Sequence, residues 1–313
     1  MTTHPLKPVK ASMMNAVHDL PLLVARDEGF FRDQGLDVEI LKTPGSGQRD
    51  SDHQALRSNI FDRTMEALYD KGACDQFRMC EWGVMKRAVE STATSGHRPA
   101  KIVALGSAMS TFAIVTDPKA RIYEPEQLKN KPIGVSPYNG SHFTTLKLLE
   151  GFLKREQIKT TFAGTMKERI EAMIRGEVAA VSLMEPWISI AEKRGLRVLM
   201  ESHSTRSEAA GDELDGATLK KMFDAEAEAA KAIEKNPAKY VHYFVEEAGG
   251  LLEAKDLRLS RLLNAPPEPY TRERFQHTYE WTRDWAWCRR ARPTRTRSTT
   301  APGSSYWMPA RRR

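Results

Sequence analysis

Two segments of this chain carry the same pattern: an amphipathic helix ends at a glycine and is followed by a short apolar run that closes with a glutamate. The segments are Glu66–Glu81 and Glu171–Glu185, and the glycines, Gly72 and Gly176, each stand nine residues before the closing glutamate. Glycine suits the left-handed conformation that ends a helix, and the run behind it has the length of one buried strand. The repeat predicts two lobes of similar α/β build. Chance agreement between two helix–glycine–strand units is the alternative.

Each copy of the repeat ends in a carboxylate and an aromatic residue, Glu81-Trp82 in the first and Glu185-Pro-Trp187 in the second. Ligands of open α/β sheets bind beyond the carboxyl ends of the strands. We therefore expect these residues to line a cleft between two lobes, with the two indole rings placed to sandwich a flat ligand. If both glutamates point into the cleft, they favour a cationic or hydrogen-bond-donating ligand such as an aminopyrimidine.

The chain length and its apolar content bound the protein class. With 313 residues, of which 40% are hydrophobic, the chain can hold two soluble domains. No apolar run approaches the roughly 20 residues that cross a bilayer, and residues 1–10 lack the apolar segment of a secretory signal. We expect no membrane span and, for the sequence as written, a cytoplasmic location; a leader missing from it would make the location periplasmic. Three cysteines without metal-ligand spacing, Cys74, Cys80 and Cys288, fit a reducing compartment.

The net charge of +7 comes from the last 26 residues. Residues 288–313 hold eight arginines and no lysine or acidic residue, and without them the chain has 40 basic against 41 acidic residues. The body is therefore close to neutral, and we expect no nucleic-acid partner. Residues 288–313 are predicted to be a disordered basic tail. An RNA- or membrane-binding arm is one interpretation, and translation in a wrong frame is the other.

Alternating strand and helix patterns predict an α/β fold with two lobes, each a mostly parallel sheet flanked by helices. Lobe 1 is expected over residues 1–107 plus about 206–287, and lobe 2 over 108–205. The predicted strands are Val9–Asn15, Leu36–Leu41, Phe77–Cys80, Lys101–Leu105, Phe112–Thr116, Pro132–Val135, Thr160–Phe162, Val178–Leu183 and Arg197–Met200. The predicted helices are Leu20–Gln34, Ile60–Lys71, Gly83–Thr92, Ser141–Glu156, Lys167–Arg175, Leu219–Glu234, Pro237–Glu247 and Thr271–Trp285. Residues Thr43–Asp52 are expected to form a loop, and no strand is expected after Leu214.

Three motifs, Asp27–Glu39, Lys131–His142 and Gly176–Pro186, resemble those of periplasmic solute-binding proteins of the nitrate/sulfonate/taurine type. The resemblance covers residues 9 to about 285. That superfamily also contains the hydroxymethylpyrimidine phosphate synthase and a sulfinate desulfinase. The resemblance implies a two-lobed fold that closes over a small molecule, with an ABC-type permease as the implied partner. The desulfinase has a nucleophilic cysteine where this chain has Ala16, and the synthase's cysteine-rich motif is missing.

Two strand ends supply further candidate ligand contacts. In the loop 136–142, Gly140 permits close backbone approach, Ser141 is a possible N-cap, and free amides at a helix start form an anion site. The resemblance places a carboxylate, sulfonate or phosphate there, although any strand–helix turn has this form. The expected contacts are Ser136, Gly140, Ser141 and His142 from this loop, and Asn15 and His18 after the first strand, where Asp19 is equally suited to be a helix cap.

Cys80 is the candidate nucleophile if the protein is an enzyme, with His53 or His18 as its base. A small buried hydrophobe is the alternative for Cys80. No dinucleotide, phosphate-loop or zinc motif is present, so no cofactor and no metal are expected. Two functions remain open: a binding protein that closes over a small organic molecule (a sulfonate, a carboxylate or an aminopyrimidine-like compound), and a cytoplasmic cofactor-free lyase or hydrolase of the same fold that acts on a small heteroaromatic compound.

Overall fold

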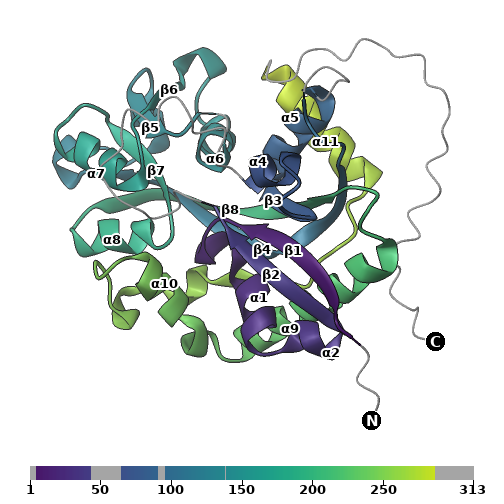
Figure 1. The fold of residues 1–313 in the computed structure, drawn as a ribbon. Coiled ribbons are helices and arrows are strands. Elements are labelled where there is room, and N and C mark those ends of the chain that lie inside the picture. Colours follow the sequence, from purple (N-terminus) through teal and green to yellow (C-terminus); the bar gives the residue numbers. More distant parts are fainter. Residues whose placement is uncertain (1–4, 44–64, 91–95, 138, 286–313) are drawn as a thin grey trace, which may run out of the picture.

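The computed structural model describes residues 5–43, 65–90, 96–137 and 139–285 (Figure 1). His53, most of the predicted loop Thr43–Asp52, the start of the helix predicted at Ile60 and the tail 288–313 lie outside these residues. The predictions made for them stay predictions.

The described residues form one mixed sheet with strands in the order β2-β1-β3-β8-β4-β7-β5-β6, and β9 pairs with β4 at its side. The strands are β1 (Lys7–Met13), β2 (Leu36–Lys42), β3 (Gln76–Cys80), β4 (Lys101–Thr116), β5 (Pro132–Val135), β6 (Lys159–Phe162), β7 (Ala180–Met184), β8 (Arg197–Ala210) and β9 (Leu263–Asn264). The α-helices are α1 (Ala16–Asp27), α2 (Phe30–Asp33), α4 (Met65–Asp70), α5 (Glu81–Glu90), α6 (Gly140–Leu149), α7 (Met166–Ile174), α8 (Trp187–Lys193), α9 (Gly216–Lys235), α10 (His242–Glu247) and α11 (Arg272–Asp284).

Each half of the sheet is parallel, and two long strands join the halves. β1 pairs in parallel with β2 and β3, and β5 pairs in parallel with β6 and β7. β4 and β8 run antiparallel to each other; β8 is also antiparallel to β3, and β4 to β7. The predicted α/β class is therefore confirmed.

Three strand predictions need correction. The strands predicted at Lys101–Leu105 and Phe112–Thr116 are one strand of 16 residues, and the strand predicted at Arg197–Met200 continues to Ala210. The missed stretches are rich in serine and threonine and begin in one case with Gly106, residues that are common in loops. Cross-strand pairing between β4 and β8 holds them in the sheet, with irregular register near Leu105 and Met109. β9 also lies after Leu214, but its two residues are too few to show a periodic pattern.

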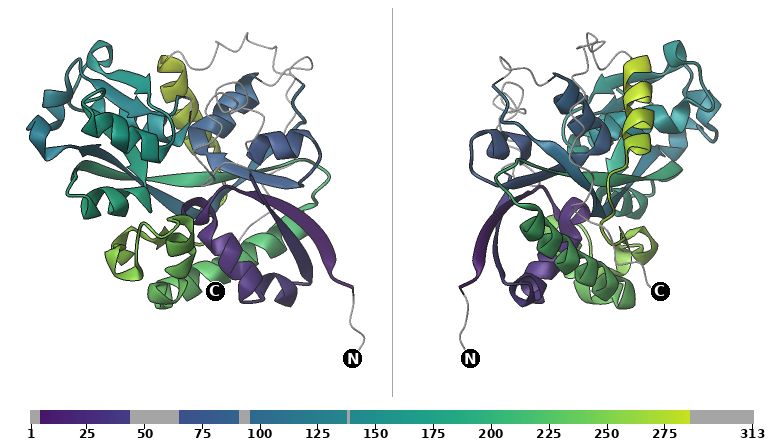
Figure 2. Two further views of the ribbon diagram at one scale, coloured as in Figure 1. Left: turned by 60° about the vertical axis from the view of Figure 1, so that its left-hand side comes forward. Right: turned by 90° about the vertical axis from the view of Figure 1, so that its right-hand side faces the viewer.

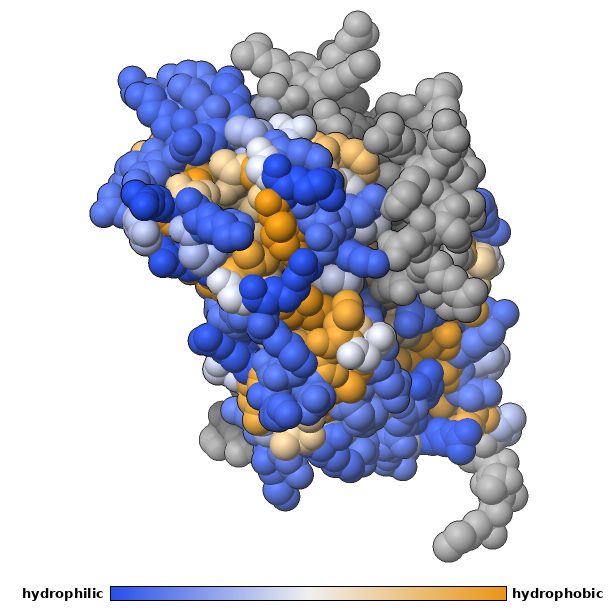
Figure 3. Space-filling model, turned by 90° about the vertical axis from the view of Figure 1, so that its left-hand side faces the viewer, coloured by the Kyte–Doolittle hydropathy of each residue, from blue (hydrophilic) through white to orange (hydrophobic). Residues whose placement is uncertain are grey.

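Helices cover both sides of the sheet. In Figures 1 and 2, α1, α2, α9 and α10 lie on one side, and α4, α5, α6 and α11 lie on the other. α9 packs along α1, and its first turn is capped by Asp215, which accepts a hydrogen bond from the Thr218 amide at 2.8 Å. None of the described helices is long and apolar enough to cross a membrane. On the face shown in Figure 3, apolar residues reach the surface in patches among hydrophilic ones.

Candidate functional site

The ends of several strands converge on the ring of Phe112 in β4. The imidazole of His18 meets this ring edge-on, with the centroids 6.5 Å apart. A Cβ added to Gly140, the first residue of α6, would lie 2.9 Å from the Cζ atom of Phe112. The side-chain amide of Asn15 lies 4.0 Å from the sulfur of Met184, at the end of β7. The structure thus brings Asn15, His18 and Gly140 together, and Gly140 is required here because a side chain would collide with the ring.

The N-terminus of α1 is capped by its own neighbours. The side-chain oxygen of Asn15 accepts a hydrogen bond from the His18 amide at 3.0 Å and lies 2.8 Å from His18 Nδ1. Burial, reinforced by the charge of Arg206, lowers the pKa of His18 well below its usual value, so the ring is neutral. Nδ1 of a neutral ring then carries the proton toward Asn15. Asp19 instead accepts hydrogen bonds from the amides of Met14 and Asn15, at 2.7 and 3.2 Å.

The loop before α6 satisfies much of its own hydrogen bonding. Asn139, and not Ser141 as the sequence predicted, caps the helix: its side chain accepts hydrogen bonds from the Ser141 amide at 3.0 Å and hydroxyl at 2.7 Å. The Ser136 amide donates to the Ser141 hydroxyl at 3.0 Å. Asn139 and Ser141 lie in the same tight turn and are both suited to cap the helix. The sequence alone does not decide between them. The amides of Ser136 and Ser141, which the predicted anion site would use, are therefore already hydrogen-bonded within the loop.

His142 contacts strand β6. Its Nε2 atom lies 2.9 Å from the hydroxyl of Thr160 in β6. Burial lowers the pKa of His142 to about 4, so its ring is neutral near pH 7. A ligand contact from His142 stays a prediction.

The first repeated glutamate, Glu81, is buried and holds α11 against α5. It is 5% exposed and begins α5. Its carboxylate accepts hydrogen bonds at 2.6 to 3.1 Å from Tyr270, Arg274 and Thr278. The Glu81 carboxylate therefore joins α11 to α5, and its contact with a ligand stays a prediction.

The second repeated glutamate, Glu185, holds α8 in the same manner. Its carboxylate accepts hydrogen bonds from the amide and the hydroxyl of Ser189, at 3.2 and 3.0 Å, and pairs with Arg261 at 3.2 Å. Burial raises the pKa of Glu185 above its usual value. The repeat thus places each glutamate at the start of the helix that follows its strand.

The two repeated tryptophans lie in different packing environments. Trp82 stacks on Phe143 at a centroid distance of 5.5 Å and approaches Trp281 at 5.8 Å. Trp187 packs against the larger hydrophobic core. Within the described residues no ring contact joins Trp82 to Trp187, so their sandwich around a ligand stays a prediction.

Cys80 lies in an apolar setting. It is 4% exposed, and burial raises the pKa of its thiol above the usual value. The thiolate is the nucleophilic form of cysteine. A protonated, buried thiol is poorly suited to attack a substrate, which favours the structural alternative for Cys80. Among the described residues, no three His, Cys, Asp or Glu side chains form a group that could hold a metal.

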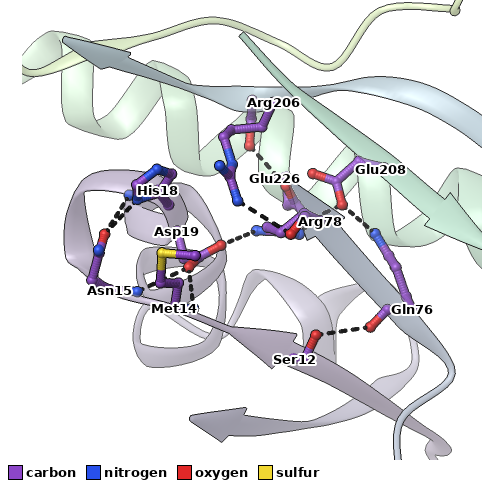
Figure 4. A network of polar contacts seen from close by, with 11 residues as sticks. Ser12, Met14, Asn15, His18, Asp19, Gln76, Arg78, Arg206, Glu208 and Glu226 are labelled. Atoms are coloured by element: carbon purple, nitrogen blue, oxygen red, sulfur yellow. Dashed lines mark hydrogen bonds and ion pairs between the residues drawn. The ribbon is translucent and has the colours of Figure 1, made fainter. Parts of the chain in front are cut away.

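The sequence did not single out a buried charge network beside His18 (Figure 4). Arg78 of β3 pairs with three carboxylates: Asp19 at 3.4 Å, Glu208 at 3.1 Å and Glu226 at 2.9 Å. All four side chains are at most 2% exposed. These four residues come from two strands and two helices that are far apart in the sequence, and no local pattern reveals which partners will meet.

Arg206 lies in this network between His18 and Arg78, but no carboxylate of the described residues forms an ion pair with it (Figure 4). It is 3% exposed, and its Nη2 donates to the carbonyl oxygen of Arg78 at 3.1 Å, while its Nε has no acceptor in the described part of the chain. Burial lowers its pKa, although a guanidinium stays charged near pH 7.

Two further buried hydroxyls, those of Ser110 and Thr144, have no hydrogen-bond partner among the described residues. In the pairing of β4 with β8, Ser110 lies opposite Ser204. Ser110 is two residues from Phe112 along β4, and Ser204 is two residues from Arg206 along β8. Because side chains alternate along strands, Ser110, Phe112 and Arg206 share one face of the sheet. Thr144 lies one turn beyond Gly140 on α6.

The chain was compared with known proteins. A sequence profile of the family described as NMT1/THI5 like matches residues 16–55. The comparison with curated proteins gives no match.

Several solved structures resemble this one along most of its length. The alkanesulfonate-binding protein SsuA from Xanthomonas axonopodis pv. citri, bound to MOPS, is 14% identical, with 92% of this chain and 96% of that chain covered and a TM-score of 0.67. The periplasmic nitrate-binding protein NrtA from Synechocystis PCC 6803 is 13% identical, with 93% and 83% covered and a TM-score of 0.66. The desulfurization enzyme DSZB is 12% identical, with 89% and 91% covered and a TM-score of 0.57. The resemblance predicted from the sequence is confirmed: this chain has the fold of the periplasmic solute-binding proteins of the sulfonate and nitrate type.

Proposed function

We propose that this protein binds a small organic molecule with an anionic group, a sulfonate or a carboxylate, and that the anionic group lies beside Arg206. The observation that carries the proposal is the unsatisfied Nε of this buried guanidinium. A buried charge is costly unless it is paired, and a buried donor without a partner costs about 1–3 kcal/mol. An anion at this point supplies the acceptor that Nε lacks, in a charge-assisted hydrogen bond.

The surroundings of Arg206 fit a small ligand. The unpartnered hydroxyl of Ser110, on the same face of the sheet, is a further donor for its oxygen atoms. The buried ring of Phe112 offers an apolar wall on that face. A cationic or aminopyrimidine-like ligand has less support, because Glu81 and Glu185, expected to attract it, are bound to side chains of the protein.

A binding role has more support than a catalytic one. The relatives named for binding, SsuA and NrtA, have higher TM-scores than DSZB. The protonated thiol of Cys80 is a weak candidate nucleophile. Delivery of the bound molecule to an ABC-type permease in a membrane is the finer part of this proposal, and it rests on the resemblance alone.

The test begins with mass spectrometry of small molecules released from the purified protein, followed by calorimetric titration with ethanesulfonate, propionate and ethylamine in sulfonate-free buffer. We expect the two anions to bind and the amine not to bind. Arg206→Met should abolish anion binding. Arg169→Met is the matched control, because Arg169 is also buried without a carboxylate partner but donates to the carbonyl oxygens of Gly164 and Ser182.

Two results would overturn the proposal. One is that no anion binds, in which case a buried water satisfies Arg206. The other is that Arg206→Met binds ethanesulfonate as tightly as the wild type.

A further inference from the structure

The buried network around Arg78 contains more negative than positive charge. Three carboxylates, those of Asp19, Glu208 and Glu226, surround two guanidiniums, Arg78 and Arg206, and all five side chains are buried. With every group ionised the cluster carries a net charge of −1. An anionic ligand beside Arg206 would add a second uncompensated negative charge, which a buried site tolerates poorly.

Glu226 is well satisfied as a carboxylate. One of its oxygens pairs with Arg78 at 2.9 Å, and the other accepts the hydroxyl of Ser107 at 2.7 Å. Asp19 accepts two backbone amides in addition to its pairing with Arg78. Both carboxylates therefore have donors on each oxygen.

Only one of the two carboxylate oxygens of Glu208 accepts hydrogen bonds from the described residues. Its Oε2 accepts hydrogen bonds from Gln76 at 2.7 Å and Arg78 at 3.1 Å. Its Oε1 lies against the backbone of β4, so close that a Cβ on Gly106 would come within 2.3 Å of it. No donor is paired with Oε1 in the described chain.

The groups that face Glu208 come from four directions. Asp19 faces it from α1 and Glu226 from α9, while Gln76 and Arg78 face it from β3, and Arg206 lies two residues away on β8. Burial raises the pKa of Glu208 to about 7, with Glu226 adding to the shift and Arg78 opposing it. Glu208 can therefore accept a proton near neutral pH.

We propose that an anion binding beside Arg206 brings one proton from solvent onto Glu208, so that the charge of the buried cluster does not change on binding. The inference rests on the proposed function and adds a linked proton to it. In the ligand-free protein at pH 8 the carboxylate of Glu208 is largely ionised. The incoming anion makes that state unfavourable, and the proton moves onto Glu208, with Oε1 as the oxygen free to take it.

The experiment is calorimetric titration of the full chain with ethanesulfonate, whose own charge is constant over the range, at pH 6, 7, 8 and 9. At pH 8 the titration is done in two sulfonate-free buffers of different ionisation enthalpy. We expect uptake of about one proton at pH 8, and an affinity that falls by about tenfold per pH unit from pH 8 to 9. Glu208→Gln, a neutral isostere, should bind with an affinity that changes less than about threefold from pH 6 to 9 and take up no proton.

The control is Glu156→Gln, which removes an exposed carboxylate far from the network and should keep the wild-type proton uptake. If Glu208→Gln does not fold, absence of proton uptake by the wild type still overturns the inference. Binding without proton uptake at pH 8 overturns the inference and leaves the proposed function intact. Absence of binding at every pH overturns both.

Discussion

Replacing the buried Arg78 by methionine should strongly destabilise the protein, whereas replacing the buried Arg206 by methionine should mainly abolish anion binding. Arg78→Met removes the partner of three buried carboxylates, those of Asp19, Glu208 and Glu226. Removing one member of a buried ion pair costs about 3–5 kcal/mol, because the remaining charge has no compensation. Protonation of Glu208, whose pKa burial raises to about 7, relieves part of this cost in acid. We therefore expect a loss of about 3–5 kcal/mol at pH 8 and a smaller loss at pH 6.

Arg206→Met should cost far less. Within the described residues its guanidinium makes one hydrogen bond, to the carbonyl oxygen of Arg78, and Nε makes none. A net hydrogen bond is worth about 0.5–1.5 kcal/mol, and the methionine recovers apolar packing without a buried charge. Because Arg206 also offsets part of the negative charge of Asp19 and Glu208, we expect some loss of stability, smaller than that of Arg78→Met, together with loss of anion binding. A residue that is retained because it binds a ligand commonly lowers the stability of the ligand-free protein.

The assay is urea unfolding of wild type and both variants at pH 6 and 8, followed by far-ultraviolet circular dichroism. The free energy of unfolding is read from the midpoint at constant slope. If Arg206→Met destabilises the protein as much as Arg78→Met does, Arg206 is a structural counter-ion of the network. The assignment of Arg206 to a ligand would then be refuted.

Three further predictions concern other parts of the molecule. Glu150→Ala should reduce stability by about 1–3 kcal/mol and red-shift the tryptophan fluorescence, because Glu150 accepts the indole N–H groups of Trp281 and Trp285 at 2.9 to 3.2 Å; an unchanged spectrum would show that α11 is not held there. His142→Asn should flatten the acid side of the pH–stability curve: the pKa of His142 is lowered to about 4, so its contribution rises with pH from about 4 to 6.5, and an unchanged slope by urea unfolding contradicts this. Cys80→Ser should leave ethanesulfonate affinity within about threefold of wild type, whereas a larger loss would give the thiol a role in binding.

The sequence predicts most of the fold because helix ends and strand patterns are local. The glycines and apolar runs of the repeat mark the ends of α4 and α7 and the strands β3 and β7 correctly. The sequence predicts β4 as two separate strands and β8 only over its first four residues, since Gly106, Ser107 and Ser202–Thr205 favour loops until they pair across the sheet.

The candidate site was only partly predictable. Asn15, His18 and Gly140 follow or precede regular elements, and their convergence on Phe112 follows from strand ends meeting at one edge. The capping of α6 by Asn139 in place of Ser141 depends on the geometry of one turn. The network of Arg78, Asp19 and Glu226 joins residues up to 148 positions apart, and no periodicity encodes such pairing.

The central claim is that a ligand's anionic group pairs with Arg206, and the most direct test is the dissociation constant of ethanesulfonate at pH 6 for wild type, Arg206→Met and Arg169→Met. The account predicts binding by wild type and by Arg169→Met, and a loss of at least about 100-fold in Arg206→Met, since a charge-assisted hydrogen bond and its desolvated partner are worth about 3 kcal/mol. Equal dissociation constants for wild type and Arg206→Met would contradict it.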